Sequence, residues 1–143
     1  MPSRTQLTLR TEVGTAWGTA EYGLGDTHAG AHWGYTTTSV ADLVEFIAAE
    51  QHTDPTSPIL DWMAGAGAVA DDGTEQNWGT ARLPGVQGTK WGWSDRGTPA
   101  AVASVSFGPG FVVAAITYGT PEPQTADVTE AITPLMLPRS RIH

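Results

Sequence analysis

Two strand-like segments that meet at a tight turn constrain this 143-residue chain more than any other feature. Residues 101–107 alternate between an apolar series and a series that holds two serines, as a strand with one deeply buried face would. Residues 111–118 are almost wholly apolar and predict a strand covered on both faces. Gly108, Pro109 and Gly110 between them are typical of a turn. The chain is therefore predicted to contain an antiparallel sheet.

Three segments predict helices. In the clearest of them, apolar residues recur with helical spacing at Val40, Leu43, Val44 and Ile47. A hydroxyl at Thr38 or Ser39 would cap the first amides of this helix. Residues 59–63 predict a second, shorter helix, and residues 125–136 a last one that Pro134 would kink or shorten.

The remaining segments complete a single domain spanning residues 1–143. Residues 4–13 alternate loosely and predict a half-buried strand at the edge of the sheet, and residues 87–94 predict a further strand. Residues 14–35 are rich in glycine and lack a period, which indicates an ordered loop with room for one short helix. The expected fold class is α/β in the broad sense (α+β): an antiparallel sheet with helices packed against it.

Composition excludes several classes of function. The formal net charge is −8, and between Thr11 and Ala81 there are eleven acidic residues and no Lys or Arg, so no nucleic-acid partner is expected. Cysteine is absent. His28 and His32 are spaced four apart, but glycine at 30 and 34 argues against a helix that would bring them together, so no metal or cofactor is expected. No stretch resembles a signal peptide or a membrane span, and a cytoplasmic or particle-associated location is expected.

The single lysine of the chain, Lys90, lies in Gly-Thr-Lys-Trp-Gly-Trp just before the two strands. Three other short segments precede it along the chain: residues 23–27, residues 33–38 and the Ile-Leu-Asp-Trp-Met of residues 59–63. Together they resemble the C-terminal part of the serine β-lactamase and penicillin-binding D,D-peptidase superfamily (class A-like), over residues 23–136. The resemblance implies a partial β-lactamase/transpeptidase-like fold.

The resemblance also implies a remnant substrate-binding cleft at Lys90, Trp91, Gly92 and Trp93. Lys90 matches the lysine of the Lys-Thr/Ser-Gly motif, whose charge favours an anionic substrate group. Gly92 matches the glycine that lets substrate backbone lie against the strand, and the backbone N–H of Trp93 matches an oxyanion-hole donor. Trp91 replaces the Thr or Ser that binds the substrate carboxylate. The alternative for Lys90 is an ion pair with Asp95 or with an acid near the C-terminus.

The other motifs of such an enzyme are missing. A chain with one lysine cannot hold both the Lys-Thr/Ser-Gly lysine and a Ser-x-x-Lys, and the single asparagine, Asn77, follows Glu75-Gln76, so Ser-x-Asn is absent too. None of the seven serines lies in Gly-x-Ser-x-Gly. No catalytic residue is assigned.

The expected function is therefore that of a pseudoenzyme. It would recognise peptidoglycan peptide or glycan, or serve as a structural protein of a larger particle such as a phage virion. The alternative is a split serine hydrolase, a β-lactamase or D,D-carboxypeptidase whose nucleophile lies on a partner chain. Such an enzyme would need an exposed apolar seam where the missing half docks.

Apolar surface near residues 40–47 or the sheet edge is expected to mediate self-association or protein–protein interaction. Six tryptophans leave two interpretations open: exposed rings that stack on sugars or anchor an interface, or buried rings that fill space beside small residues.

Overall fold

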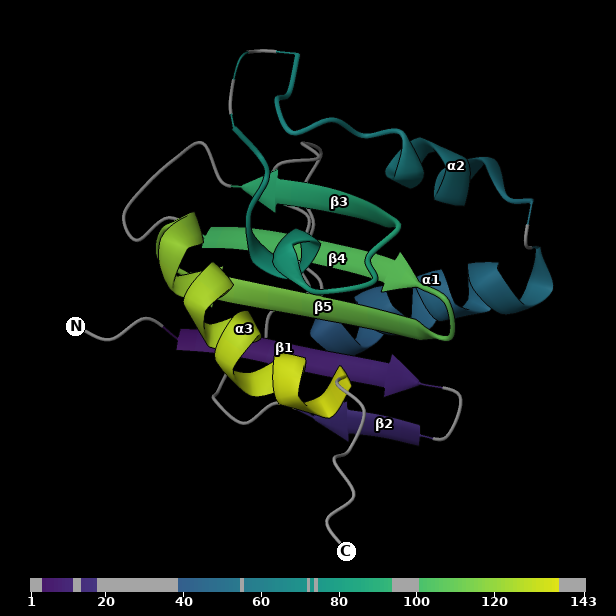
Figure 1. Ribbon diagram of the computed structural model, residues 1–143, viewed down its shortest axis with the longest axis horizontal. Helices are drawn as coiled ribbons and strands as arrows, with labels where there is room; N and C mark the ends of the chain where they lie inside the picture. The colour runs from purple at the N-terminus through teal and green to yellow at the C-terminus, as the bar shows by residue number, and fades with distance from the viewer. Residues whose placement is uncertain are drawn as a thin grey trace, which may run out of the picture.

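The computed structural model describes residues 4–11, 14–17, 39–54, 56–71, 73, 75–93 and 101–136 (Figure 1). Its five strands form one antiparallel sheet in the order β2-β1-β5-β4-β3. The strands are β1 (Arg4–Thr11), β2 (Gly14–Trp17), β3 (Gly88–Trp93), β4 (Ala101–Gly108) and β5 (Phe111–Tyr118). The helices are α1 (Val40–Thr53), α2 (Pro58–Ala64), α3 (Pro121–Met136) and the short 3-10 helix η2 (Gly79–Arg82). The predicted α+β class, an antiparallel sheet with packed helices, is confirmed.

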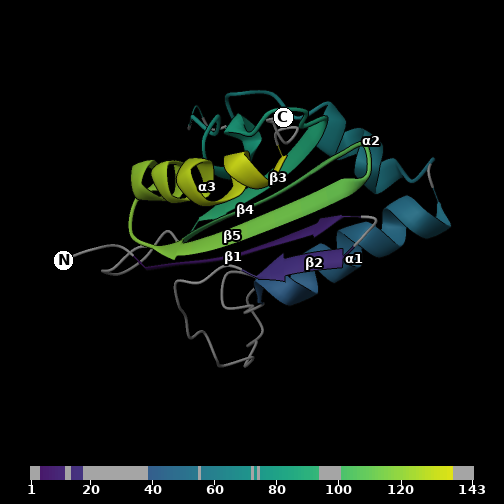
Figure 2. The same ribbon diagram turned by 60° about the horizontal axis from the view of Figure 1, so that its bottom comes forward.

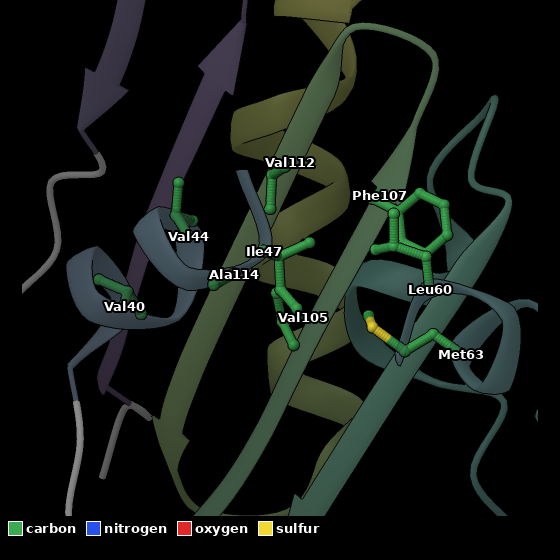
Figure 3. Close-up of a cluster of buried hydrophobic side chains, with 9 residues drawn as sticks. All are labelled: Val40, Val44, Ile47, Leu60, Met63, Val105, Phe107, Val112 and Ala114. Atoms are coloured by element: carbon green, nitrogen blue, oxygen red, sulfur yellow. The ribbon is translucent and has the colours of Figure 1, made fainter. Parts of the chain in front are cut away.

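Helices cover both faces of the sheet, with α1 on one side and α3 on the other (Figure 2). On the first side, Val44 and Ile47 of α1 and Leu60 of α2 pack against Phe107 of β4 and Val112 of β5, within a cluster shown in Figure 3.

Both α1 and α2 begin at a serine: Ser39 accepts a hydrogen bond from the amide of Asp42, and Ser57 one from the amide of Ile59. The predicted cap at Ser39 is thus present.

A second core lies on the opposite face. Leu7 and Leu9 of β1 and Val113 of β5 pack there against Val128 and Ile132 of α3. Because alternate residues of β5 enter one core or the other, the strand is buried on both faces, as its unbroken apolar sequence predicts.

Four sequence expectations need correction. The first strand is internal, between β2 and β5, and residues 14–17 extend the sheet instead of forming a loop. The last helix starts at Pro121, ahead of the predicted position 125. β4 is buried on both faces, because Ser104 and Ser106 are inaccessible to solvent as well. Their hydroxyl groups are hydrogen-bonded inside the core, which removes the cost of burying them.

Candidate functional site

The candidate site lies on β3, an outer strand of the sheet. Among the described residues β3 pairs on one side only, with β4, in a register that sets Lys90 opposite Val105 and Trp91 opposite Ser104. Successive side chains of a strand point to opposite faces. The pleat therefore divides the four predicted cleft residues, Lys90, Trp91, Gly92 and Trp93, into two pairs.

Trp91 belongs to the interior. Its side chain is only 6% exposed, and its indole Nε1 donates a hydrogen bond to the backbone carbonyl of Trp78 at 2.9 Å. Trp78, Trp91 and Val102 form a small core cluster against which the half-buried Trp93 packs. The ring of Trp91 thus fills the core beside η2.

Lys90 and Gly92 lie on the other face of β3, the one that carries α2. The direction of this face is fixed by Gly88, where an added Cβ would lie 2.9 Å from the backbone of Met63 in α2. The Lys90 side chain is exposed, and its ammonium donates a hydrogen bond to the carbonyl of Trp91. Gly92 is exposed too, with no atom within 4 Å of the position that a Cβ would take. Only this pair of the predicted cleft therefore faces an open surface.

A small hollow of about 180 Å³ adjoins the first half of β3. It lies between the strand and the segment after α2, and its walls include Ala64, Ala68, Gly88, Thr89 and Trp91. The volume is below the several hundred Å³ usual for small-molecule sites, so the hollow alone would hold a side chain and not a whole ligand.

The described serines have structural roles. Ser39 and Ser57 cap helices, whereas Ser104 and Ser106 lie on the face of β4 that is opposite to Lys90. Activation of a serine requires an adjacent base. Each of these four hydroxyls is thus engaged away from the lysine.

Behind β3 lies a buried polar network that the sequence interpretation missed. Thr89 of β3 is hydrogen-bonded to Ser106, and Ser106 to Thr80 of η2, at 2.7 Å each. Thr80 Oγ1 donates to Ser104, which donates in turn to the side-chain oxygen of Gln124 in α3 at 2.7 Å. A hydroxyl has one proton, so these bonds can run in one direction only, from Thr89 toward Gln124.

The network continues from Gln124 to the far side of the sheet. The amide nitrogen of Gln124 donates to the carbonyl of Val102 and to Thr117 Oγ1, at 3.0 Å each. Thr117 is hydrogen-bonded to Thr5, and Thr5 donates to the carboxylate of Asp127 at 2.5 Å. A run of Ser and Thr on alternate strand positions, with a glutamine near a helix start, was the available sequence signal. The network connects β3 to β1 and α3, so the Lys90 strand has fixed polar support on its buried face.

Two larger surface hollows lie away from Lys90. One of about 740 Å³ lies near the β4–β5 turn and includes Arg10, His52 and Phe111 in its wall. The other, of about 880 Å³, lies between η2 and α3 and includes Trp78 and Arg82.

Within the described part of the chain, no group of three or more His, Asp or Glu side chains could hold a metal ion, and no helix is both long and apolar enough to cross a bilayer. His28, His32 and Asp95 lie outside the described residues. Comparison of the sequence with protein-family models and curated proteins, and of the fold with solved structures, finds no match.

Proposed function

We propose that this chain is a catalytically degenerate domain of the serine β-lactamase and D,D-peptidase type that binds a peptide instead of cleaving it. The order of its elements supports the proposal: two helices, a lysine-bearing strand, a further strand, a tight turn, a strand and a final helix packed on the sheet. The proposed ligand is an extended peptide such as a peptidoglycan stem peptide. The same interaction could anchor the chain within a larger particle such as a phage virion.

The observation that carries this proposal is the exposure of Lys90 and Gly92 together on an outer strand. The outer edge of a strand offers N–H and C=O groups to a further strand, and an extended peptide can add there by backbone hydrogen bonds. Gly92 has no side chain to hold such a peptide away. The ammonium of Lys90 lies two residues before it on the same face and would attract the peptide's terminal carboxylate.

The same residues support binding without chemistry. Lys90 is the only lysine of the chain, so a Ser-x-x-Lys nucleophile is excluded by the sequence itself. Trp91 stands where the resemblance expects a carboxylate-binding hydroxyl, and its ring is buried. Carboxylate recognition therefore rests on Lys90.

Titration with diacetyl-Lys-D-Ala-D-Ala, followed by amide NMR shifts, tests the proposal. Saturable shifts centred on residues 90–93 are expected. Lys90→Met should weaken binding about tenfold, the usual effect of removing one charged hydrogen bond. Arg82→Met is the matched control, because Arg82 is also an exposed cation but lies on η2. Shifts that are absent, or that respond equally to both variants, would refute a site on β3.

A second candidate function is a split serine hydrolase completed by a partner chain. One observation favours it: Phe46 of α1 and Trp62 of α2 are 53% and 71% exposed, which is the kind of apolar surface that a missing half would cover. The test is to search the adjacent reading frames for Ser-x-x-Lys and Ser-x-Asn, and then to treat the co-expressed pair with a penicillin-type probe. Acylation of the partner only when both chains are present would favour this function over the first.

A further inference from the structure

The outer side of the α1–α2 layer combines exposed aromatic rings with acidic side chains. Phe46 and Trp62 are two of the five exposed large apolar side chains of the described residues. Both helices bury their other face in the same core cluster, so their outer sides belong to one layer of the molecule (Figure 3). Aromatic side chains left in water are costly unless a partner covers them, and they are frequent anchors of interfaces.

Helix geometry places Phe46 on the flank of α1 that faces away from β1. Val44 and Ile47 point into the core, and Glu45 points toward β1, where its carboxylate pairs with Arg10. Each residue advances about 100° around a helix, so Phe46 lies on the flank opposite to Glu45. Since α1 packs over β1 and β5 and α2 packs over β3, this flank faces the α2 side of the layer.

The charges of the layer are of one sign. The described residues 39–71 contain no Lys or Arg. Their acidic side chains are Asp42, Glu45, Glu50, Asp54, Asp61 and Asp71. Arg10 pairs with Glu45, and this is the only ion pair that the described residues contain. Lys90 lies on the same side of the sheet, but among the described residues its ammonium forms no ion pair with these carboxylates. Phe46 therefore has carboxylates one turn before it and one turn after it, at Asp42 and Glu50, and neither forms an ion pair with another described residue.

We propose that this surface, defined by Phe46, Trp62, Asp42, Glu50 and Asp61, docks a basic, apolar segment of another protein. Apolar side chains of the partner would cover the two rings, and its lysines or arginines would meet the carboxylates. A second copy of this chain is a poor occupant, because symmetric pairing would bring the same carboxylates together. The inference goes beyond peptide binding on β3 and holds whether or not β3 binds a ligand.

Binding of a labelled, amphipathic Leu/Lys peptide to the full chain tests the proposal by fluorescence anisotropy. A peptide about 14 residues long forms about four helical turns. Saturable binding is expected at about 25 mM salt and weaker binding at about 300 mM, because the Debye length falls. Phe46→Ala and Trp62→Ala should each weaken binding about tenfold, as removal of an interface anchor does.

Leu135→Ala is the matched control. Leu135 is 57% exposed, comparable to Phe46, but it lies on α3, which packs on the opposite face of the sheet. All three side chains are exposed, so the variants should unfold at the same temperature as the parent. The double variant Asp42→Asn, Glu50→Gln keeps both aromatic rings but removes two carboxylates. Its affinity for the peptide should therefore depend less on salt.

Three outcomes would overturn the docking surface. Binding that is unchanged by Phe46→Ala and Trp62→Ala would mean that the peptide senses net charge alone. Equal losses with Leu135→Ala would mean that it has no preferred face. Sedimentation of the chain alone as a dimer that Phe46→Ala dissociates would make a second copy the occupant. Results with the β3 ligand leave these outcomes unaffected, because that titration reads residues 90–93.

Discussion

Gln124 and Ser104 join the first turn of α3 to the middle of β4: the Ser104 hydroxyl donates to the side-chain oxygen of Gln124 at 2.7 Å. The amide nitrogen of Gln124 is used as well, by the carbonyl of Val102 and by Thr117. Gln124 is fully buried, so each of these groups has lost water and depends on the others. This one side chain therefore joins α3 to β4 and β5 directly, and to η2 through Ser104.

Gln124→Leu should lower the free energy of unfolding by about 2–4 kcal/mol, because it leaves several buried polar groups without partners. Urea unfolding followed by circular dichroism measures the change. Gln87→Leu, at an exposed glutamine, is the control and should change the stability by less than about 0.5 kcal/mol. A loss below about 1 kcal/mol for Gln124→Leu would show that the network adds little net stability.

Gly79→Ala should disrupt the same network from η2. Gly79 has φ of +70°, and an added Cβ would lie 2.5 Å from both Gln124 Oε1 and Ser104 Oγ. Gly73→Ala separates the two effects, because φ is +88° there but nothing lies within 4 Å. We expect a loss of about 1–2 kcal/mol for Gly73→Ala from backbone strain alone, and a clearly larger loss for Gly79→Ala. Equal losses in urea unfolding would contradict the steric argument.

Substitution by alanine at two glycines of β3 should lower stability to very different extents. At Gly88 a Cβ would lie 2.6 Å from the Phe107 ring and 2.8 Å from the backbone of Ala64, whereas at Gly92 it would meet nothing. Gly88→Ala should cost about 1–3 kcal/mol through overpacking, and Gly92→Ala less than about 0.5 kcal/mol. Thermal unfolding compares the two variants directly. A larger loss at Gly92 would mean that this position is not open.

Adjacent residues of α1 distinguish the core from the proposed docking surface. Ile47→Arg places a charge in the core cluster and should unfold the domain, at a cost of about 4 kcal/mol or more. Phe46→Arg should leave stability unchanged or raise it by about 0.5 kcal/mol, since the new cation lies one turn from both Asp42 and Glu50. Circular dichroism and thermal unfolding measure both variants. Loss of fold with Phe46→Arg would mean that the ring contributes to the core.

Incubation with a penicillin-type probe should leave the mass of the isolated chain unchanged. The described serines are engaged as helix caps or inside the core, and no Ser-x-x-Lys exists in the sequence. Intact-mass measurement detects an acyl adduct, and chromogenic β-lactam turnover detects hydrolysis. A single adduct on one serine would refute the degenerate site.

Local sequence patterns predicted the helices and turns whose formation depends on residues close together in the sequence. The spacing of Val40, Val44 and Ile47 and the hydroxyl at Ser39 specify α1 and its start, because helical contacts and caps lie within four residues. The turn at Gly108–Gly110 and the flanking strands are local for the same reason. The sequence likewise excludes Ser-x-x-Lys, since a missing residue needs no structure to establish it.

Long-range packing decided the rest. β1 pairs with β5, although the two strands lie near opposite ends of the sequence. No local sequence pattern encodes a pairing between segments so far apart. The alternation of side chains along a strand places Lys90 and Trp91 on opposite faces of β3. Only the packing of Trp91 against Trp78 decides that the tryptophan face is the buried one. The sequence pattern placed Ser104 on the less buried side of its strand and did not single out Gln124, because polarity favours exposure unless every hydrogen-bonding group finds a partner. Those partners come from β3, β5, η2 and α3, and only the tertiary structure brings them together.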